Sequence, residues 1–75
     1  SLSAFKRDFK EAYNDTPGNW LRNKRLEMAS YLLKTKDISV AECAFKVGYE
    51  NCSYFIKIFK NQYGISPKQF KLQNN

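Results

Sequence analysis

The feature that most constrains the fold is an internal repeat with an offset of 50 residues. Residues 3–17 (SAFKRDFKEAYNDTP) align without a gap to residues 53–67 (SYFIKIFKNQYGISP). A further aromatic residue follows each copy, Trp20 after the first and Phe70 after the second. A match of this quality indicates that one structural unit occurs twice. The identical pairs are Ser3 and Ser53, Phe5 and Phe55, Phe9 and Phe59, Lys10 and Lys60, Tyr13 and Tyr63, and Pro17 and Pro67.

Each copy has the pattern of an amphipathic helix. Its aromatic residues recur every four positions, so they lie on one helical face, and this spacing predicts a buried stripe. The stripes are Phe5, Phe9 and Tyr13 in the first copy and Phe55, Phe59 and Tyr63 in the second. The outward positions are expected to be free of acids and to carry the binding residues. These positions are Ser3, Lys6, Arg7 and Lys10, and in the second copy Ser53, Ile56, Lys57, Lys60 and Asn61.

Capping residues mark the ends of these helices. Ser1 and Asn51 are suited to N-cap positions, and Gly64 is suited to end the second helix. Thr16-Pro17 and Ser66-Pro67 are each an N-cap followed by a first-turn proline, so each predicts the start of another helix. Each copy is therefore expected to be a helix, a short turn and a helix.

The segment between the copies predicts two more helices. Residues 17–34 read as a linker helix that ends at Asp37-Ile38. Ser39 and Glu42 form a capping-box pair that opens a helix burying Val40, Cys43, Ala44 and Val47. That helix ends at Gly48, and a turn over residues 48–51 leads to a recognition helix that begins near Cys52. Two short helices joined by a tight glycine turn describe a helix-turn-helix.

The predicted fold is all-α and homeodomain-like. We expect residues 1–15 to form the recognition helix of a truncated first helix-turn-helix, residues 16–36 the linker helix, and residues 37–75 a complete C-terminal unit. The offset of 50, applied to residues 39–48, points to positions before residue 1. The sequence is therefore expected to be a fragment cut through a tandem repeat.

The composition narrows the classes of function expected for the chain. The chain carries 13 Lys and Arg against 7 Asp and Glu, and this net charge of +6 favours a polyanionic partner. It has no His and only Cys43 and Cys52, so the usual general base and a four-ligand zinc site are both missing. Two cysteines nine residues apart, without a signal peptide, favour a reducing intracellular setting. We predict no enzyme, no cofactor, no metal and no membrane-spanning segment.

The helix that begins at Cys52 has the properties of a DNA-reading helix. The major groove of B-DNA admits one α-helix, whose outward side chains meet base edges while flanking Lys and Arg contact phosphates. On this basis Ser53, Ile56 and Lys57 are expected to face bases, and Lys60 and Asn61 to face phosphates. Residues 51–75 contain four Lys and no acid, which supports a positive field on this side.

The segment from Ser39 to Lys71 resembles the C-terminal signature of AraC/XylS-type transcription regulators. The resemblance rests on Val47-Gly48-Tyr49, Ser53-Tyr54-Phe55 and Phe59-Lys60, and on YGISP at residues 63–67 followed by Phe70. Arg25-Leu26, with Ala29, Leu32 and Leu33, is similar to the linker helix of that family.

The resemblance implies sequence-specific binding of double-stranded DNA by a bacterial transcription regulator. It implies two recognition helices in successive major grooves on one face of the duplex. A separate effector-binding domain, absent from this fragment, would control the regulator. It also implies contact with RNA polymerase through the intact regulator, and a cytoplasmic, nucleoid-associated location.

Base-reading positions carry over from the family to both recognition helices. They fall on Ser3, Lys6 and Arg7 in the first helix and on Cys52, Ser53, Ile56 and Lys57 in the second. Ile56 stands where the family more often has a polar residue, and Lys57 where it more often has Arg. At position 57 the lysine ammonium, a point charge, thus replaces an arginine guanidinium, which can donate two hydrogen bonds to one partner.

The sequence is also compatible with other functions. A basic amphipathic helix is also typical of protein-interaction modules and of modules that bind membrane surfaces. RNA binding is a third class, although no aromatic platform on strands is predicted. Cys52, near a helix N-terminus, could also act as a redox sensor.

Overall fold

The computed structural model describes residues 1–73 and contains five α-helices and no strand within that range. Their bounds are α1 Leu2–Tyr13, α2 Pro17–Thr35, α3 Val40–Lys46, α4 Cys52–Tyr63 and α5 Pro67–Gln73. The all-α class is as predicted, and helices occur at all the predicted places. Residues 74 and 75, the end of the predicted C-terminal unit, lie outside the described residues.

The helices begin where the capping residues predict. The side-chain oxygens of Ser1, Thr16, Ser39 and Asn51 each accept a hydrogen bond from the backbone N–H three residues on, at 3.0 to 3.2 Å. These bonds satisfy backbone donors that a helix start otherwise leaves unpaired. Gly64 ends α4 with a φ of 81°, a left-handed conformation that suits glycine.

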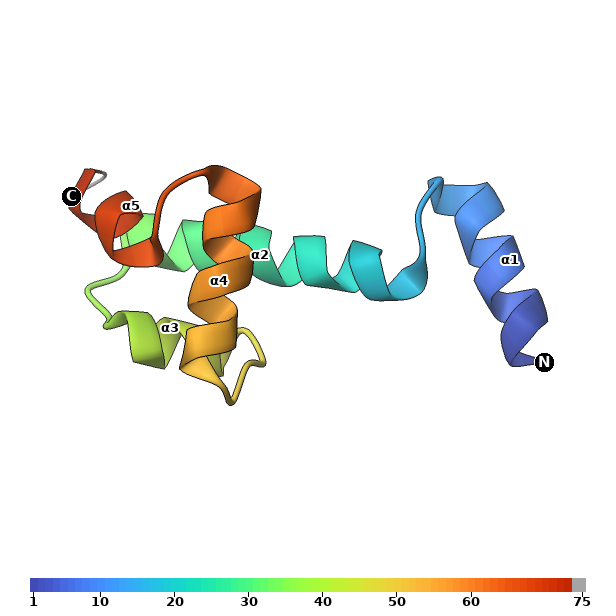
Figure 1. Cartoon of the computed structure of the whole chain (residues 1–75), viewed down its shortest axis with the longest axis horizontal. Coiled ribbons are helices and arrows are strands. Elements are labelled where there is room, and N and C mark those ends of the chain that lie inside the picture. Colours follow the sequence, from blue (N-terminus) through green and yellow to red (C-terminus); the bar gives the residue numbers. More distant parts are fainter. Residues whose placement is uncertain (74–75) are drawn as a thin grey trace.

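The hydrophobic core lies in the second half of the chain, where α3, α4 and α5 pack against the C-terminal part of α2 (Figure 1). Phe55 and Phe59 of α4 are fully buried, and Phe59 meets Phe70 of α5 edge-to-face with ring centroids 5.5 Å apart. The second aromatic stripe is therefore buried as predicted, with Tyr63 packed at its edge. The other buried hydrophobic side chains are Leu26, Ala29, Leu33, Cys43, Ala44, Val47 and Ile58.

The first aromatic stripe does not form a core, and here the prediction was wrong. Phe5 is 53% exposed and Tyr13 57% exposed, and only Phe9 is half-buried. The stripe packs on itself and on Trp20, with the Phe9 and Trp20 ring centroids 5.7 Å apart. Figure 1 shows why: α1 stands at the N-terminal end of α2, away from the other helices. In the described residues nothing covers α1 as α3 covers α4.

The turn between α3 and α4 closes on the side chain of Arg25. The N–H of Tyr49 donates to the carbonyl of Ala44 at 2.9 Å, and the guanidinium of Arg25 lies over the Tyr49 ring at 5.5 Å. Gly48 adopts a φ of 102°, and a Cβ added there would approach Cζ of Arg25 to 3.2 Å. Both the backbone angle and the close approach therefore require glycine.

We expect Gly48→Ala to lower the free energy of unfolding by about 1 to 3 kcal/mol because it forces a side chain into this conformation. The matched control is Gly18→Ala in the first turn of α2, where an added Cβ meets nothing within 4 Å. Alanine favours helix over glycine by up to about 1 kcal/mol, so the control should be neutral or stabilising. Urea denaturation followed by circular dichroism measures both, and equal midpoints would contradict the assignment.

The Cys43 thiol is fully buried in α3 and donates a hydrogen bond to the carbonyl of Ala29 at 3.6 Å. Burial raises the pKa of this thiol from 9.0 to about 11, because desolvation disfavours the thiolate. The unfolded chain loses this proton first, so folding stability is complete below pH 9 and falls as the pH rises toward 11.

A maleimide probe is therefore expected to label Cys52, which is half-buried, before Cys43. Mass spectrometry of peptides after timed labelling measures the order. The order should disappear in denaturant, where both thiols are exposed. Faster labelling of Cys43 in the folded chain would show that α3 does not seal it.

Candidate nucleic-acid interface

The outward face of α4 presents most of the predicted contact residues. Phe55, Ile58 and Phe59 face the core, so the opposite side of the helix carries exposed Ser53, Lys57, Lys60 and Asn61. Ile56 lies at the flank of this face and is 37% exposed. Cys52 differs from the others because it is half-buried and packs against the core. The structure thus places Lys57 near the centre of an exposed surface.

The outward face of α1 presents Ser3, Lys6, Arg7 and Lys10, all exposed. One acid, Asp8, lies beside this face. Nε of Arg7 lies 3.8 Å from a carboxylate oxygen of Asp8, with both side chains 70% exposed. An ion pair this exposed is weak, and the approach of a polyanion can break it. The face remains positive, because its three basic side chains outnumber this one acid.

The helix α2 holds α1 and α4 apart. Its 19 residues span about 28 Å at the usual rise per residue. The aromatic rings of Phe9 and Tyr13 pack α1 against Trp20 at the N-terminal end of α2. Side chains of α4 line a pocket together with Leu26 of α2, and Figure 1 shows α4 crossing α2. The two repeat-related helices therefore stand at separate points along one straight element.

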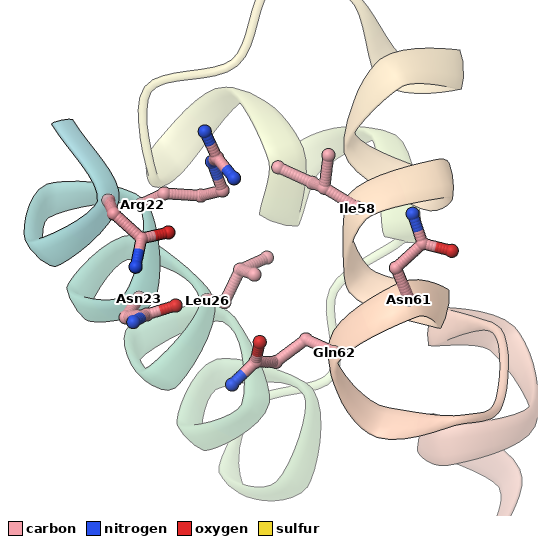
Figure 2. Close-up of a pocket in the computed structure, with 7 residues that line it drawn as sticks. Arg22, Asn23, Leu26, Ile58, Asn61 and Gln62 are labelled. Carbon is pink, nitrogen blue, oxygen red and sulfur yellow. The ribbon is translucent and has the colours of Figure 1, made fainter.

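A polar pocket of about 130 Å³ lies between α2 and the C-terminal half of α4. Figure 2 shows Arg22 and Asn23 of α2 opposite Asn61 and Gln62 of α4, with Leu26 and Ile58 between the two helices. Asn19 completes the lining. Of these residues only Asn61 was predicted to bind a ligand. The others were missed because they belong to two helices whose crossing the sequence pattern does not specify.

The charges of the C-terminal unit are unevenly distributed. Acids are confined to the α3 side, where Glu42 pairs with Lys46 at 4.0 Å, and to the segments that flank α3. From Asn51 to the end of α5 the chain has lysines and no acid. One of them, Lys71, is engaged inside the fold, where its Nζ donates to the carbonyl of Ile38 at 2.6 Å. The remaining lysines after residue 51 are Lys57 and Lys60 on α4 and Lys68 on α5, all exposed.

Within residues 1–73, no group of three or more His, Cys, Asp and Glu side chains is arranged to hold a metal ion. In the same range, no helix combines the length and the apolar character that crossing a bilayer requires.

The fold and its two basic helix faces define a helix-turn-helix protein. A helix-turn-helix domain family matches residues 1–73. The chain belongs to this family, in its AraC type.

Its relatives include transcriptional regulators. The chain is 39% identical over 71 residues to an uncharacterized HTH-type transcriptional regulator of Haemophilus influenzae, with 95% of the chain aligned. It is 36% identical over 74 residues to the HTH-type transcriptional regulator AlkR of Acinetobacter baylyi, with 99% aligned. The chain spans 24% of the length of each of these two relatives.

Solved structures agree with the fold. The C-terminal domain of the two-component response regulator yesN from Fusobacterium nucleatum superposes with a TM-score of 0.91 at 37% identity, covering 95% of this chain and 69% of that one. The DNA-binding domain of AdpA, a global transcriptional factor solved in complex with a target DNA, gives 0.94 at 32% identity, covering 97% and 66%.

Proposed function

We propose that this chain binds double-stranded DNA in a sequence-specific manner, as part of a bacterial transcription regulator, with α1 and α4 in successive major grooves. The observation that carries the proposal is the pair of repeat-related helices, held apart on α2, that both expose basic side chains. Grooves on one face of B-DNA recur about every 34 Å, so two reading helices on one duplex must stand apart, as α1 and α4 do along α2. The AdpA domain, solved with DNA, shares this fold and supports the proposal.

The proposal assigns each site residue a role. Ser53, Ile56 and Lys57 of α4 face base edges, and Cys52 lies at the edge of this set. Lys60 and Asn61 face phosphates. In α1, the base-facing residues are Ser3, Lys6 and Arg7, with Lys10 on the backbone. A lysine ammonium suits the O6 and N7 acceptors of guanine, and the Ile56 side chain suits a thymine methyl.

Salt dependence of binding tests this function. Fluorescence anisotropy with a mixed-sequence duplex, measured from about 50 to 200 mM salt, gives the slope of log affinity against log salt. About four phosphate contacts predict a slope near −3.6. No binding at the lowest salt would contradict the proposal for this chain.

One observation favours a second candidate, a helical module that binds a protein or a membrane surface. Leu2, Phe5 and Tyr13 of α1 are exposed, while Lys6, Arg7 and Lys10 supply charge to the same helix. Exposed apolar and basic faces on one helix are typical of interfacial helices. Titration with anionic vesicles in the same buffer separates the two, because the DNA proposal requires tighter binding to the duplex than to the vesicles.

The proposal extends to the regulator to which the chain belongs. We propose that it acts in the bacterial cytoplasm at the nucleoid, that an effector-binding domain controls it, and that it contacts RNA polymerase. The role assigned to this chain is binding, without catalysis. Co-purification of the regulator with RNA polymerase on promoter DNA would test the last contact.

A further inference from the structure

Every polar side chain that lines the pocket between α2 and α4 carries a hydrogen-bond donor. Arg22 contributes a guanidinium, and Asn19, Asn23, Asn61 and Gln62 contribute amides. None of the lining residues is acidic. Such a set of donors, with one fixed positive charge, matches the oxygens of an anion.

Arg22 is available for such a ligand. Within the described residues its guanidinium makes no ion pair and no hydrogen bond, whereas Lys24, two residues on, pairs with Glu27 at 3.4 Å and lies over the Trp20 ring. The carboxylate of Asp15, just before α2, accepts hydrogen bonds from the Asn19 amide at 2.9 Å and from the N–H of Thr16 at 2.8 Å. The charge of Arg22 is therefore not neutralised by the protein.

On α2 the pocket is lined by residues between Asn19 and Leu26, the part of this helix that leads from its N-terminal end, next to α1, toward the crossing with α4. A duplex that receives both helices in successive major grooves presents the intervening minor groove, bordered by two phosphate backbones, to this part of α2. Lys57 and Lys60 add exposed positive charge elsewhere on α4.

We infer that Arg22, with the amides of Asn23, Asn61 and Gln62, binds a backbone phosphate between the two major grooves. The inference rests on the proposed DNA binding and adds a third contact region to it. A contact here would fix the position of α2 against the duplex, and thereby the depth to which α1 and α4 enter their grooves. It would carry no base preference, because a phosphate is common to all sequences.

The test compares Arg22→Gln with Lys24→Gln. Glutamine retains an amide donor but removes the charge, and Lys24 is the matched control because it lies on the opposite side of α2. Loss of one phosphate contact is expected to weaken duplex binding about tenfold at low salt and to make the log-log salt slope shallower by about 0.9. Lys24→Gln should leave the slope unchanged. Equal slopes for the two variants, both folded by circular dichroism, would overturn the inference.

A neutral methylphosphonate at single positions of the duplex locates the contact. At the inter-groove position it should weaken the chain with Arg22 intact more than it weakens Arg22→Gln, because the two changes remove the same charged contact and their effects are not additive. Additive losses at every such position would mean that Arg22 acts through the general field and binds no particular phosphate.

Inorganic phosphate separates a failure of this site from a failure of DNA binding. Titration into the labelled chain, followed by nuclear magnetic resonance, should shift the side-chain amide signals of Asn23, Asn61 and Gln62, and Arg22→Gln should abolish the shifts. If phosphate causes these shifts in a chain that binds no duplex, the anion site is supported and the DNA proposal is rejected. If the chain binds the duplex but phosphate causes no such shifts, and the log-log salt slope is unchanged in Arg22→Gln, the anion site is rejected and the DNA proposal stands.

Discussion

Phe55→Ala is expected to lower the free energy of unfolding by about 3 to 5 kcal/mol, whereas Phe5→Ala, at the equivalent position of the repeat, should cost less than about 1 kcal/mol. Phe55 is 0% exposed at the centre of the C-terminal core, and Phe5 is 53% exposed on α1. The residues replaced are identical and their sequence surroundings are similar, so the difference measures the packing around each ring.

Urea denaturation followed by circular dichroism measures the comparison, with the shift of the midpoint at constant slope as the readout. A domain of this size has little stability to spare, so Phe55→Ala can leave the core unfolded in water. Phe55→Leu then provides a milder step, because it retains much of the buried volume. Similar losses from Phe5→Ala and Phe55→Ala would mean that α1 is buried against something in solution.

The second large effect is expected from Lys57→Ala, on duplex affinity. It is expected to cost about 1 to 3 kcal/mol of duplex affinity and to relax the preference at one base pair, because Lys57 lies at the centre of the proposed base-reading face of α4. Lys60→Ala is the matched control, one turn later on the same face. As a phosphate contact it should weaken all sequences alike and make the salt slope shallower by about 1.

Selection from a random duplex library gives the base preferences of the two variants and of the unchanged chain. The expected result is one relaxed position for Lys57→Ala and an unchanged pattern for Lys60→Ala. Loss of affinity without any change of preference in both variants would reject base reading by Lys57 and assign it to the backbone.

Much of the fold could be predicted because its signals are local. Ser39 and Asn51 cap their helices through hydrogen bonds three residues away, and Gly64 ends α4 through its own backbone angle. The outward direction of Lys57 and Lys60 follows from helical period alone once Phe55 and Phe59 are recognised as core.

The features that were missed depend on partners distant in sequence. A Phe, Phe, Tyr stripe shows which face is apolar, but not whether another helix covers it, and so the exposure of Phe5 was not foreseen. The approach of Arg25 to Gly48 and the pocket formed by Arg22 with Asn61 join residues more than 20 positions apart. Helical period contains no information on such crossings, because they depend on the angle at which two helices pack.

The linker helix α2 has one further consequence. Each residue of an α-helix advances the axis by about 1.5 Å and turns it by about 100°. A single residue inserted between Trp20 and Leu26 would therefore rotate α1 by about a quarter turn relative to α4, and the two would no longer address one side of a duplex. Four inserted residues nearly restore the rotation but add about 6 Å, close to two base-pair steps. Under the proposed function, the number of residues in α2, more than their identity, would set the half-site spacing that the regulator accepts.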